Sequence, residues 1–163
     1  MPSLSSQHTP QLIRFWGRLG ALSWVVVGAR CLVGAVFVLA GFSKLLLPHA
    51  EVLALMQQYT VLPQALLPWL ATVLPWIEVA SGTALAIGWY TTLAALVVGL
   101  QLVGFSLLMV VVLAAGISIE DCGCFGQFGL SETPLQVLLR DLVMLALLGP
   151  VLTRQSNVMS FDR

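Results

Sequence analysis

Charged side chains are scarce in this chain of 163 residues. Only 9% of the residues are Asp, Glu, Lys or Arg, whereas a soluble domain carries about 25%. The chain is 59% hydrophobic, with a mean hydropathy of +0.99. A soluble fold of this length cannot bury so much apolar surface, so lipid must solvate much of it. The net charge of zero gives no sign of a nucleic-acid partner.

Cysteine and histidine are also rare, with three and two residues. No haem-attachment spacing is present, and three cysteines are too few for an iron–sulfur cluster held by four thiolates. A structural zinc site needs about four ligands, and Cys122, Cys124, His49 and Asp121 show no recognisable ligand spacing. Two thiolates alone could hold Cu(I). We therefore expect no metal site.

Long apolar segments are what the sequence has in place of charge. Each is close to the roughly 20 residues that cross a bilayer as a helix, and four segments are too few for a barrel. We predict an all-α membrane protein, an antiparallel bundle of four transmembrane helices with short interfacial helices. The predicted transmembrane domain covers residues 21–152. Its four helices are 21–43, 66–88, 93–115 and 134–152.

Shorter elements are expected around these helices. Residues 1–20 are predicted to form a cytoplasmic tail with an interfacial helix over Gln11–Gly20, because its apolar residues share one helical stripe. A second interfacial helix is predicted over Glu51–Leu62, and residues 153–163 form a cytoplasmic tail. Thr133, followed by Pro134 and by Gln136 three residues on, predicts a capped start for the last helix.

The basic residues predict the orientation. They precede the first helix and follow the last one, as Arg14, Arg18, Arg154 and Arg163. Under the positive-inside rule both termini are cytoplasmic, which agrees with an even number of crossings. The loop after the third helix then lies outside. Lys44 is a single exception in the first outer loop. The expected location is a bacterial inner membrane.

The outer loop holds the sequence Cys122-Gly123-Cys124. Disulfides form and persist in an oxidising compartment, and glycine eases closure of so small a ring. A strained, exposed disulfide is typically labile or catalytic, so redox exchange is one interpretation and a static bridge is another. The acidic neighbours Glu120 and Asp121 disfavour a reactive thiolate. Cys31, deep in the first helix, is expected to be an inert core residue.

Five charged residues lie in or beside the predicted helices. Such residues usually face the bundle interior and pair there. Counting 1.5 Å per residue from the helix ends puts Arg30 and Glu78 at similar depth, which predicts an ion pair between them. Arg140 and Asp141 are adjacent, so they point about 100° apart and should need different partners; Lys44 is a candidate for Asp141. The network could fix helix order, or it could form a polar pocket for a ligand such as a quinone head group, or a proton path.

These residues together resemble the MauE family, within the wider DoxX-like membrane proteins. The resemblance covers roughly residues 30–152. The matching positions, in chain order, are Arg30, Lys44, Glu78, Cys122, Cys124 and Arg140, with Asp141 beside the last. The resemblance implies a four-helix inner-membrane protein with a role in maturing methylamine dehydrogenase, whose small subunit is rich in disulfides, alongside a thioredoxin-like partner.

The leading hypothesis is a membrane component of thiol–disulfide exchange that helps to mature exported redox proteins. Cys122 and Cys124 would then be catalytic. A dithiol must pass its two electrons on, and the chain has no second pair, so either a quinone or a soluble thioredoxin-like protein would complete the relay. The alternative is a non-enzymatic scaffold in which a structural Cys-Gly-Cys bridge pins the loop. A transport accessory is disfavoured, because four helices are few and no inverted repeat is apparent.

Overall fold

The computed structural model describes residues 9–59, 62–116 and 133–153, and every regular element in these ranges is a helix. Four of the helices are long and apolar enough to span a membrane, which confirms the predicted fold class. The fifth, α2, is short. The elements are α1 (Thr9–Leu46), α2 (His49–Gln57), α3 (Leu67–Ile87), α4 (Thr91–Ala114) and α5 (Pro134–Thr153).

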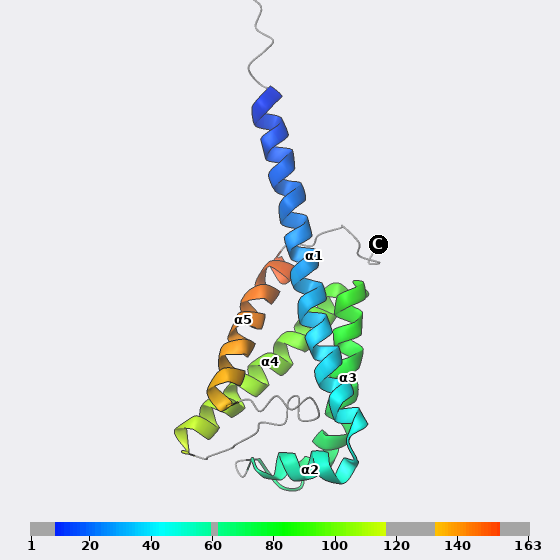
Figure 1. The fold of residues 1–163 in the computed structure, drawn as a ribbon, viewed down its shortest axis with the longest axis vertical. Helices are drawn as coiled ribbons and strands as arrows, with labels where there is room; N and C mark the ends of the chain where they lie inside the picture. Colours follow the sequence, from blue (N-terminus) through cyan, green and yellow to red (C-terminus); the bar gives the residue numbers. More distant parts are fainter. Residues whose placement is uncertain (1–8, 60–61, 117–132, 154–163) are drawn as a thin grey trace, which may run out of the picture.

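Helix α1 differs from its predicted form. It runs without a break over 38 residues, so Gln11–Gly20 continues the long helix and is not a separate element. No proline or cap interrupts the chain where the two predicted helices would join, around Gly20 and Ala21. The part of α1 that could span a membrane is Trp24–Leu46. The remainder projects beyond the other helices (Figure 1).

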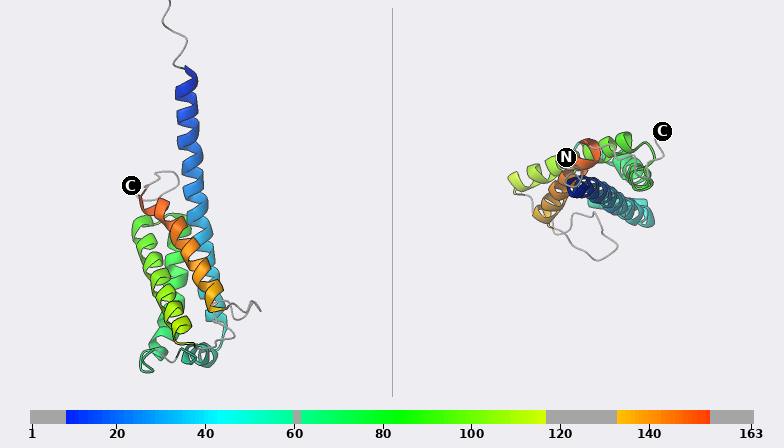
Figure 2. Two further views of the ribbon diagram at one scale, coloured as in Figure 1. Left: turned by 90° about the vertical axis from the view of Figure 1, so that its left-hand side faces the viewer. Right: turned by 90° about the horizontal axis from the view of Figure 1, so that it is seen from above.

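The bundle is built from two closely packed pairs. Helix α1 packs most extensively on α3, and α4 packs on α5. Contacts of α1 with α5 and of α3 with α4 join the pairs. Helix α2 lies across one end of the bundle and contacts α3, while the last turn of α5 lies toward the opposite end (Figures 1 and 2). The end of α4 and the start of α5 therefore lie at the same end as α2.

Glycines explain the close contact of α1 with α3. A Cβ added at Gly34 would lie 2.6 Å from the carbonyl oxygen of Gly82, and one added at Gly41 would lie 2.7 Å from that of Pro75. Small residues at helix interfaces let backbones approach closely in membranes. The two contacts also fix the register, because residues seven apart on α1 face residues seven apart on the antiparallel α3.

Local signals in the sequence set two helix ends. The amide of Thr133 donates to Gln136 Oε1 (2.9 Å), and the amide of Gln136 donates to Thr133 Oγ1 (3.4 Å), which is the predicted capping box of α5. Gly88, at φ 80°, ends α3. Its amide donates to Leu85 O, and the amide of Trp89 donates to Ala84 O, which is a Schellman motif that turns the chain into α4.

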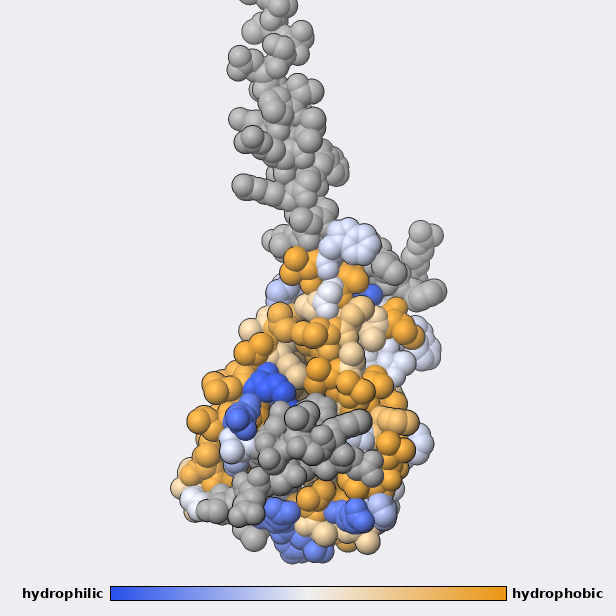
Figure 3. Space-filling model, viewed as in Figure 1, coloured by the Kyte–Doolittle hydropathy of each residue, from blue (hydrophilic) through white to orange (hydrophobic). Residues whose placement is uncertain are grey.

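The outer surface of the bundle is apolar. Side chains such as Trp69 and Leu100 are 72% and 75% exposed. Figure 3 shows hydrophobic residues over most of the visible bundle, with hydrophilic ones at the end where α2 lies and in a small patch partway up the left side. In water such a surface would drive association, whereas in a bilayer it meets acyl chains. The four long helices are therefore membrane-embedded.

Candidate functional site

An ion pair joins the end of α1 to the middle of α3. Lys44 Nζ lies 2.8 Å from both carboxylate oxygens of Glu78, and the two side chains are 10% and 2% exposed. The ammonium also lies 5.8 Å from the centre of the Phe105 ring on α4, within the range of a cation–π contact. Burial at this level requires that each charge be neutralised.

The predicted pair of Arg30 with Glu78 is therefore wrong. The prediction aligned the outer ends of the two helices, but the glycine contacts stagger them. Cys31 donates its thiol hydrogen to the carbonyl of Ala86 (3.6 Å), which puts Arg30 near the far end of α3. Arg30 is itself buried, with 3% exposure, about 21 Å along α1 from Lys44.

Side-chain direction explains why Lys44 can reach Glu78. Side chains on a helix lean toward its N-terminus. Because α1 and α3 are antiparallel, Lys44 leans back along α1 while Glu78 leans back along α3. The two groups converge beside Gly41, whose added Cβ would lie 2.9 Å from Glu78 Cβ.

A second pair lies on α5. Arg140 Nε and Nη2 each lie 3.3 Å from Asp141 Oδ1, and the side chain of Asp141 is 2% exposed. The sequence predicted different partners for these neighbours, whereas in the structure they bond to each other. Lys44, which was the candidate for Asp141, is bonded to Glu78 instead.

The two pairs meet in one charged cluster, which consists of Lys44, Glu78, Arg140 and Asp141. The four residues line a common cavity of about 20 Å³, and Arg140 also lies close enough to Glu78 for an electrostatic interaction. The cluster has two positive and two negative charges. It joins three helices, α1, α3 and α5, and it includes four of the five residues predicted to form an intramembrane polar network.

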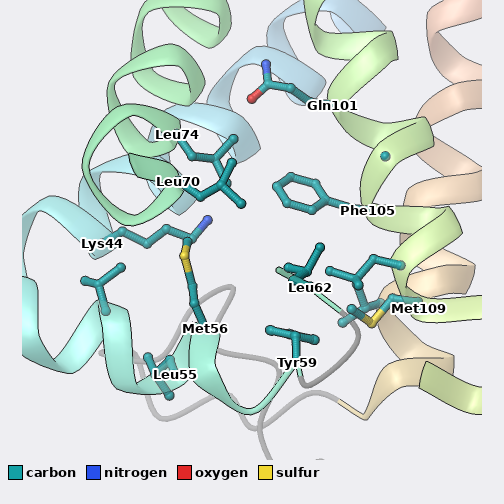
Figure 4. A pocket seen from close by; sticks show the side chains of 14 residues that line it. Lys44, Leu55, Met56, Tyr59, Leu62, Leu70, Leu74, Gln101, Phe105 and Met109 are labelled. Atoms are coloured by element: carbon teal, nitrogen blue, oxygen red, sulfur yellow. The ribbon is translucent and has the colours of Figure 1, made fainter. Parts of the chain in front are cut away.

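A larger cavity of about 270 Å³ adjoins the charged cluster, and Lys44 and Phe105 line both this cavity and the smaller one. We call it the α2 cavity, because α2 and the residues after it cover one side (Figure 4). Apart from Lys44, Tyr59 and Gln101 its lining is apolar. The lining residues are Lys44, Val52, Leu55, Met56, Tyr59, Leu62, Leu70, Leu74, Gln101, Gly104, Phe105, Leu108, Met109 and Val137.

Sequence reasoning did not identify the α2 cavity. Gln101 gave a signal that could have found it, because it is the only side-chain amide in α4 and polar groups in a transmembrane helix usually face the protein interior. Gln101 Nε2 donates to Ser81 Oγ (3.2 Å) and, more weakly, to Val97 O (3.4 Å). Phe105 gave no such signal, since an aromatic residue in an apolar helix is unremarkable.

Cys31 differs from its expected place in the core. Its thiol lies on the exposed surface of α1, so in a bilayer it faces lipid. Cys122 and Cys124 belong to the segment that joins α4 to α5 and lie outside the described residues. Within the described parts of the chain, no three His, Cys, Asp or Glu side chains form a group that could hold a metal ion.

Comparison with known proteins adds the family. The family model described as methylamine utilisation protein MauE matches residues 22–154. That range contains the four apolar membrane spans, the charged cluster, the α2 cavity and the Cys-Gly-Cys segment. Neither the curated proteins nor the solved structures gave a significant match. The family match covers most of the chain, and its helices are those of a multi-pass membrane protein. The chain therefore belongs to the MauE family of methylamine utilisation proteins.

Proposed function

We propose that this protein is a bacterial inner-membrane accessory for the maturation of exported redox proteins, and that it acts through thiol–disulfide exchange at Cys122 and Cys124. The observation that carries the proposal is the Cys-Gly-Cys sequence in the one long connection of a MauE-family bundle. The positive-inside rule favours an external position for that connection, where disulfides persist.

The proposed exchange moves two electrons and two protons from the client to the cysteine pair. A thiolate of the client attacks one sulfur of an oxidised Cys122–Cys124 pair and forms a mixed disulfide, while the other sulfur leaves as a thiolate. A second client thiolate then attacks the client sulfur of the mixed disulfide. The client gains a disulfide, and Cys122 and Cys124 take up two electrons and two protons. A thioredoxin-like protein outside the membrane, or a quinone, then accepts these electrons.

The bundle supports this proposal as a rigid base for the loop. Ala114 and Pro134 are the helix ends that flank the loop segment, and both lie at the α2 end of the bundle. The charged cluster ties α5 to α1 and α3. The helix that follows the Cys-Gly-Cys segment is therefore held in place by contacts outside that segment.

Trapping a mixed disulfide tests the proposal. In a Cys31→Ala background, Cys122→Ser and Cys124→Ser each remove one member of the pair. The remaining cysteine can attack the disulfide of an oxidised exported partner, and no neighbouring thiol is left to resolve the mixed disulfide that forms. We expect one of the two variants to accumulate a covalent complex with an exported protein, visible as a band that reductant removes. The matched control is the double variant Cys122→Ser/Cys124→Ser, which should trap nothing.

The opposite result is equally definite. If neither single variant traps a partner, and the wild-type pair stays oxidised at potentials well below about −300 mV, the bridge is a structural staple. Full maturation of exported clients in cells carrying the double variant would lead to the same conclusion. The protein would then act as a scaffold.

A further inference from the structure

The α2 cavity has the dimensions and lining of a small-molecule site. Its volume of about 270 Å³ approaches the range of about 300–1,000 Å³ for ligand pockets, which combine apolar walls with a few polar groups. It receives residues from every helix: Lys44 from α1, then α2, α3, α4 and α5. An interior that is otherwise closely packed does not leave such a volume without cost.

The charge of the lining indicates an uncharged ligand. Among the residues that the structure describes, Lys44 is the only charged one that lines the α2 cavity, and Glu78 neutralises it through both carboxylate oxygens. An anion would therefore compete with Glu78 for the ammonium, and a cation would meet Lys44 with no acidic residue in the lining. A neutral molecule that dissolves in the bilayer avoids both costs.

Two of the three polar residues in the lining, Lys44 and Gln101, favour a ligand that can form hydrogen bonds. A lysine ammonium has three N–H donors. Among the described residues only Glu78 accepts hydrogen bonds from Lys44, through two oxygens, which leaves one donor for a ligand acceptor. Gln101 donates through Nε2, but its carbonyl oxygen is buried and has no hydrogen-bond partner among the described residues. Figure 4 shows the Gln101 carbonyl on the side of Leu74 and Leu70, which line the cavity.

Phe105 supplies a flat surface between these groups. Its ring stands in the cavity in Figure 4, between Gln101 and the leucine and methionine side chains of the opposite end. Aromatic rings prefer offset-stacked or edge-to-face contacts with one another. An acyl chain would use the apolar walls but neither the free Lys44 N–H nor the Gln101 amide. A planar ring with carbonyl or hydroxyl groups would use all of them.

We infer that the α2 cavity binds the ring of a lipid-soluble quinone, with Lys44 donating to a quinone carbonyl and the Gln101 amide contacting the second oxygen. The quinol form fits as well, because its hydroxyl can donate to the Gln101 carbonyl. This binding requires nothing of Cys122 and Cys124, so it stands or falls independently of the proposed function.

A matched pair of compounds tests the inference with the full-length protein in nanodiscs. The probe is 2,3-dimethyl-1,4-naphthoquinone, whose substituted ring cannot add thiols, and the control is 2,3-dimethylnaphthalene, which has the same rings without oxygens. After equilibrium dialysis, the excess of each compound over empty nanodiscs is measured. We expect a saturable excess near one quinone per protein. The quinone should bind at least about tenfold more tightly than the hydrocarbon, because the hydrocarbon cannot form the two hydrogen bonds.

Three variants locate the site. Gly104 lines the cavity, and a Cβ added there meets nothing within 4 Å, so Gly104→Leu should occupy part of the cavity without disturbing the helix and weaken binding about tenfold or more. Gly28→Leu is the matched control, because Gly28 is also an exposed helix position with open space but lies outside the cavity. Gln101→Leu should weaken quinone binding about three- to tenfold and leave the hydrocarbon unaffected.

Four outcomes would overturn the inference. They are the absence of any excess over empty nanodiscs, equal binding of the quinone and the hydrocarbon, equal binding by wild type and Gly104→Leu, and equal loss with Gly28→Leu. If Gly104→Leu fails to fold, the comparison of the two compounds on wild type and Gln101→Leu decides the question alone.

Discussion

Lys44 Nζ lies 2.8 Å from both carboxylate oxygens of Glu78, and the two residues come from α1 and α3, the most extensively packed helix pair. The carboxylate is almost fully buried and also lies near Arg140. A charge so placed depends on its partner, since no water is present in the bilayer core to replace it. The arrangement of α1 against α3 therefore depends on the presence of both residues.

Removal of one partner should lower the free energy of unfolding more than removal of both partners does. Lys44→Met or Glu78→Gln alone should lower the free energy of unfolding by about 3–5 kcal/mol, because one buried group is left without its partner. The double variant should lose less than the sum of the single losses. The measurement is unfolding in mixed micelles, followed by circular dichroism.

Arg30 provides the control for this cycle. Arg30 lies four helical turns from Lys44 along α1, and Glu78 is bonded elsewhere, so the losses from Arg30→Gln and Glu78→Gln should add to within about 0.5 kcal/mol. Strong coupling of Arg30 to Glu78, together with additivity for Lys44, would mean that the described pairing is incorrect.

The four spans and the start of α5 could be predicted because each depends on residues close together in the sequence. Apolar length identifies a transmembrane helix, and Thr133 with Gln136 forms a cap within one turn. The partner of Glu78 could not be predicted in the same way. It depends on the register of α1 against α3, and a stagger of a few residues moves a side chain by more than the length of an ion pair.

The α2 cavity shows a similar limit. It combines residues from five helices, so no local pattern describes it, although the lone Gln101 amide marked one wall. The extent of α1 could not be predicted from the sequence for a different reason. Amphipathic spacing over Gln11–Gly20 indicated a surface helix, but helical spacing is equally consistent with the continuation of the next helix.

The glycine contacts between α1 and α3 predict an unequal response to the same substitution. At Gly34, the added methyl of Gly34→Ala would lie 2.6 Å from a backbone oxygen, so the helices must separate, at a cost of about 1–3 kcal/mol. At Gly28 nothing lies within 4 Å, and Gly28→Ala should be neutral or stabilise α1 by up to about 1 kcal/mol. Thermal unfolding of the two variants in one detergent makes the comparison.

Equal behaviour at the two positions would contradict this packing. A loss of stability with Gly28→Ala alone would do so as well. Gly82→Ala provides a second site on the opposite helix, because its Cβ would lie 2.8 Å from the carbonyl oxygen of Gly34. Gly34→Ala and Gly82→Ala report on one contact, so their losses should not add.

The capping box of α5 predicts a smaller effect. Thr133→Ala removes the hydroxyl that accepts from the Gln136 amide and should cost about 1 kcal/mol, while Thr133→Ser keeps the oxygen and should cost less. Thr153→Ala is the control, because the Thr153 hydroxyl donates to Gly149 O within the last turn and caps no helix start. Equal losses for the alanine and serine variants at position 133 would show that the hydroxyl contributes nothing.

The orientation of the chain can be tested through its cysteines. We expect a membrane-impermeant maleimide, added to intact spheroplasts after mild reduction, to label Cys122 or Cys124, because the basic chain ends favour an external loop. Cys31 should not react, since its thiol faces lipid and the thiolate that attacks maleimide is costly in hydrocarbon. Labelling should therefore persist in Cys31→Ala and disappear in Cys122→Ser/Cys124→Ser.

Ser6→Cys, placed in a variant without other cysteines, gives the internal control and should react only after permeabilisation. If Ser6→Cys reacts in intact spheroplasts while the loop needs permeabilisation, both termini are external. The cysteine pair would then lie in a reducing compartment, where a stable disulfide is not expected, and thiol–disulfide exchange with exported proteins would be excluded.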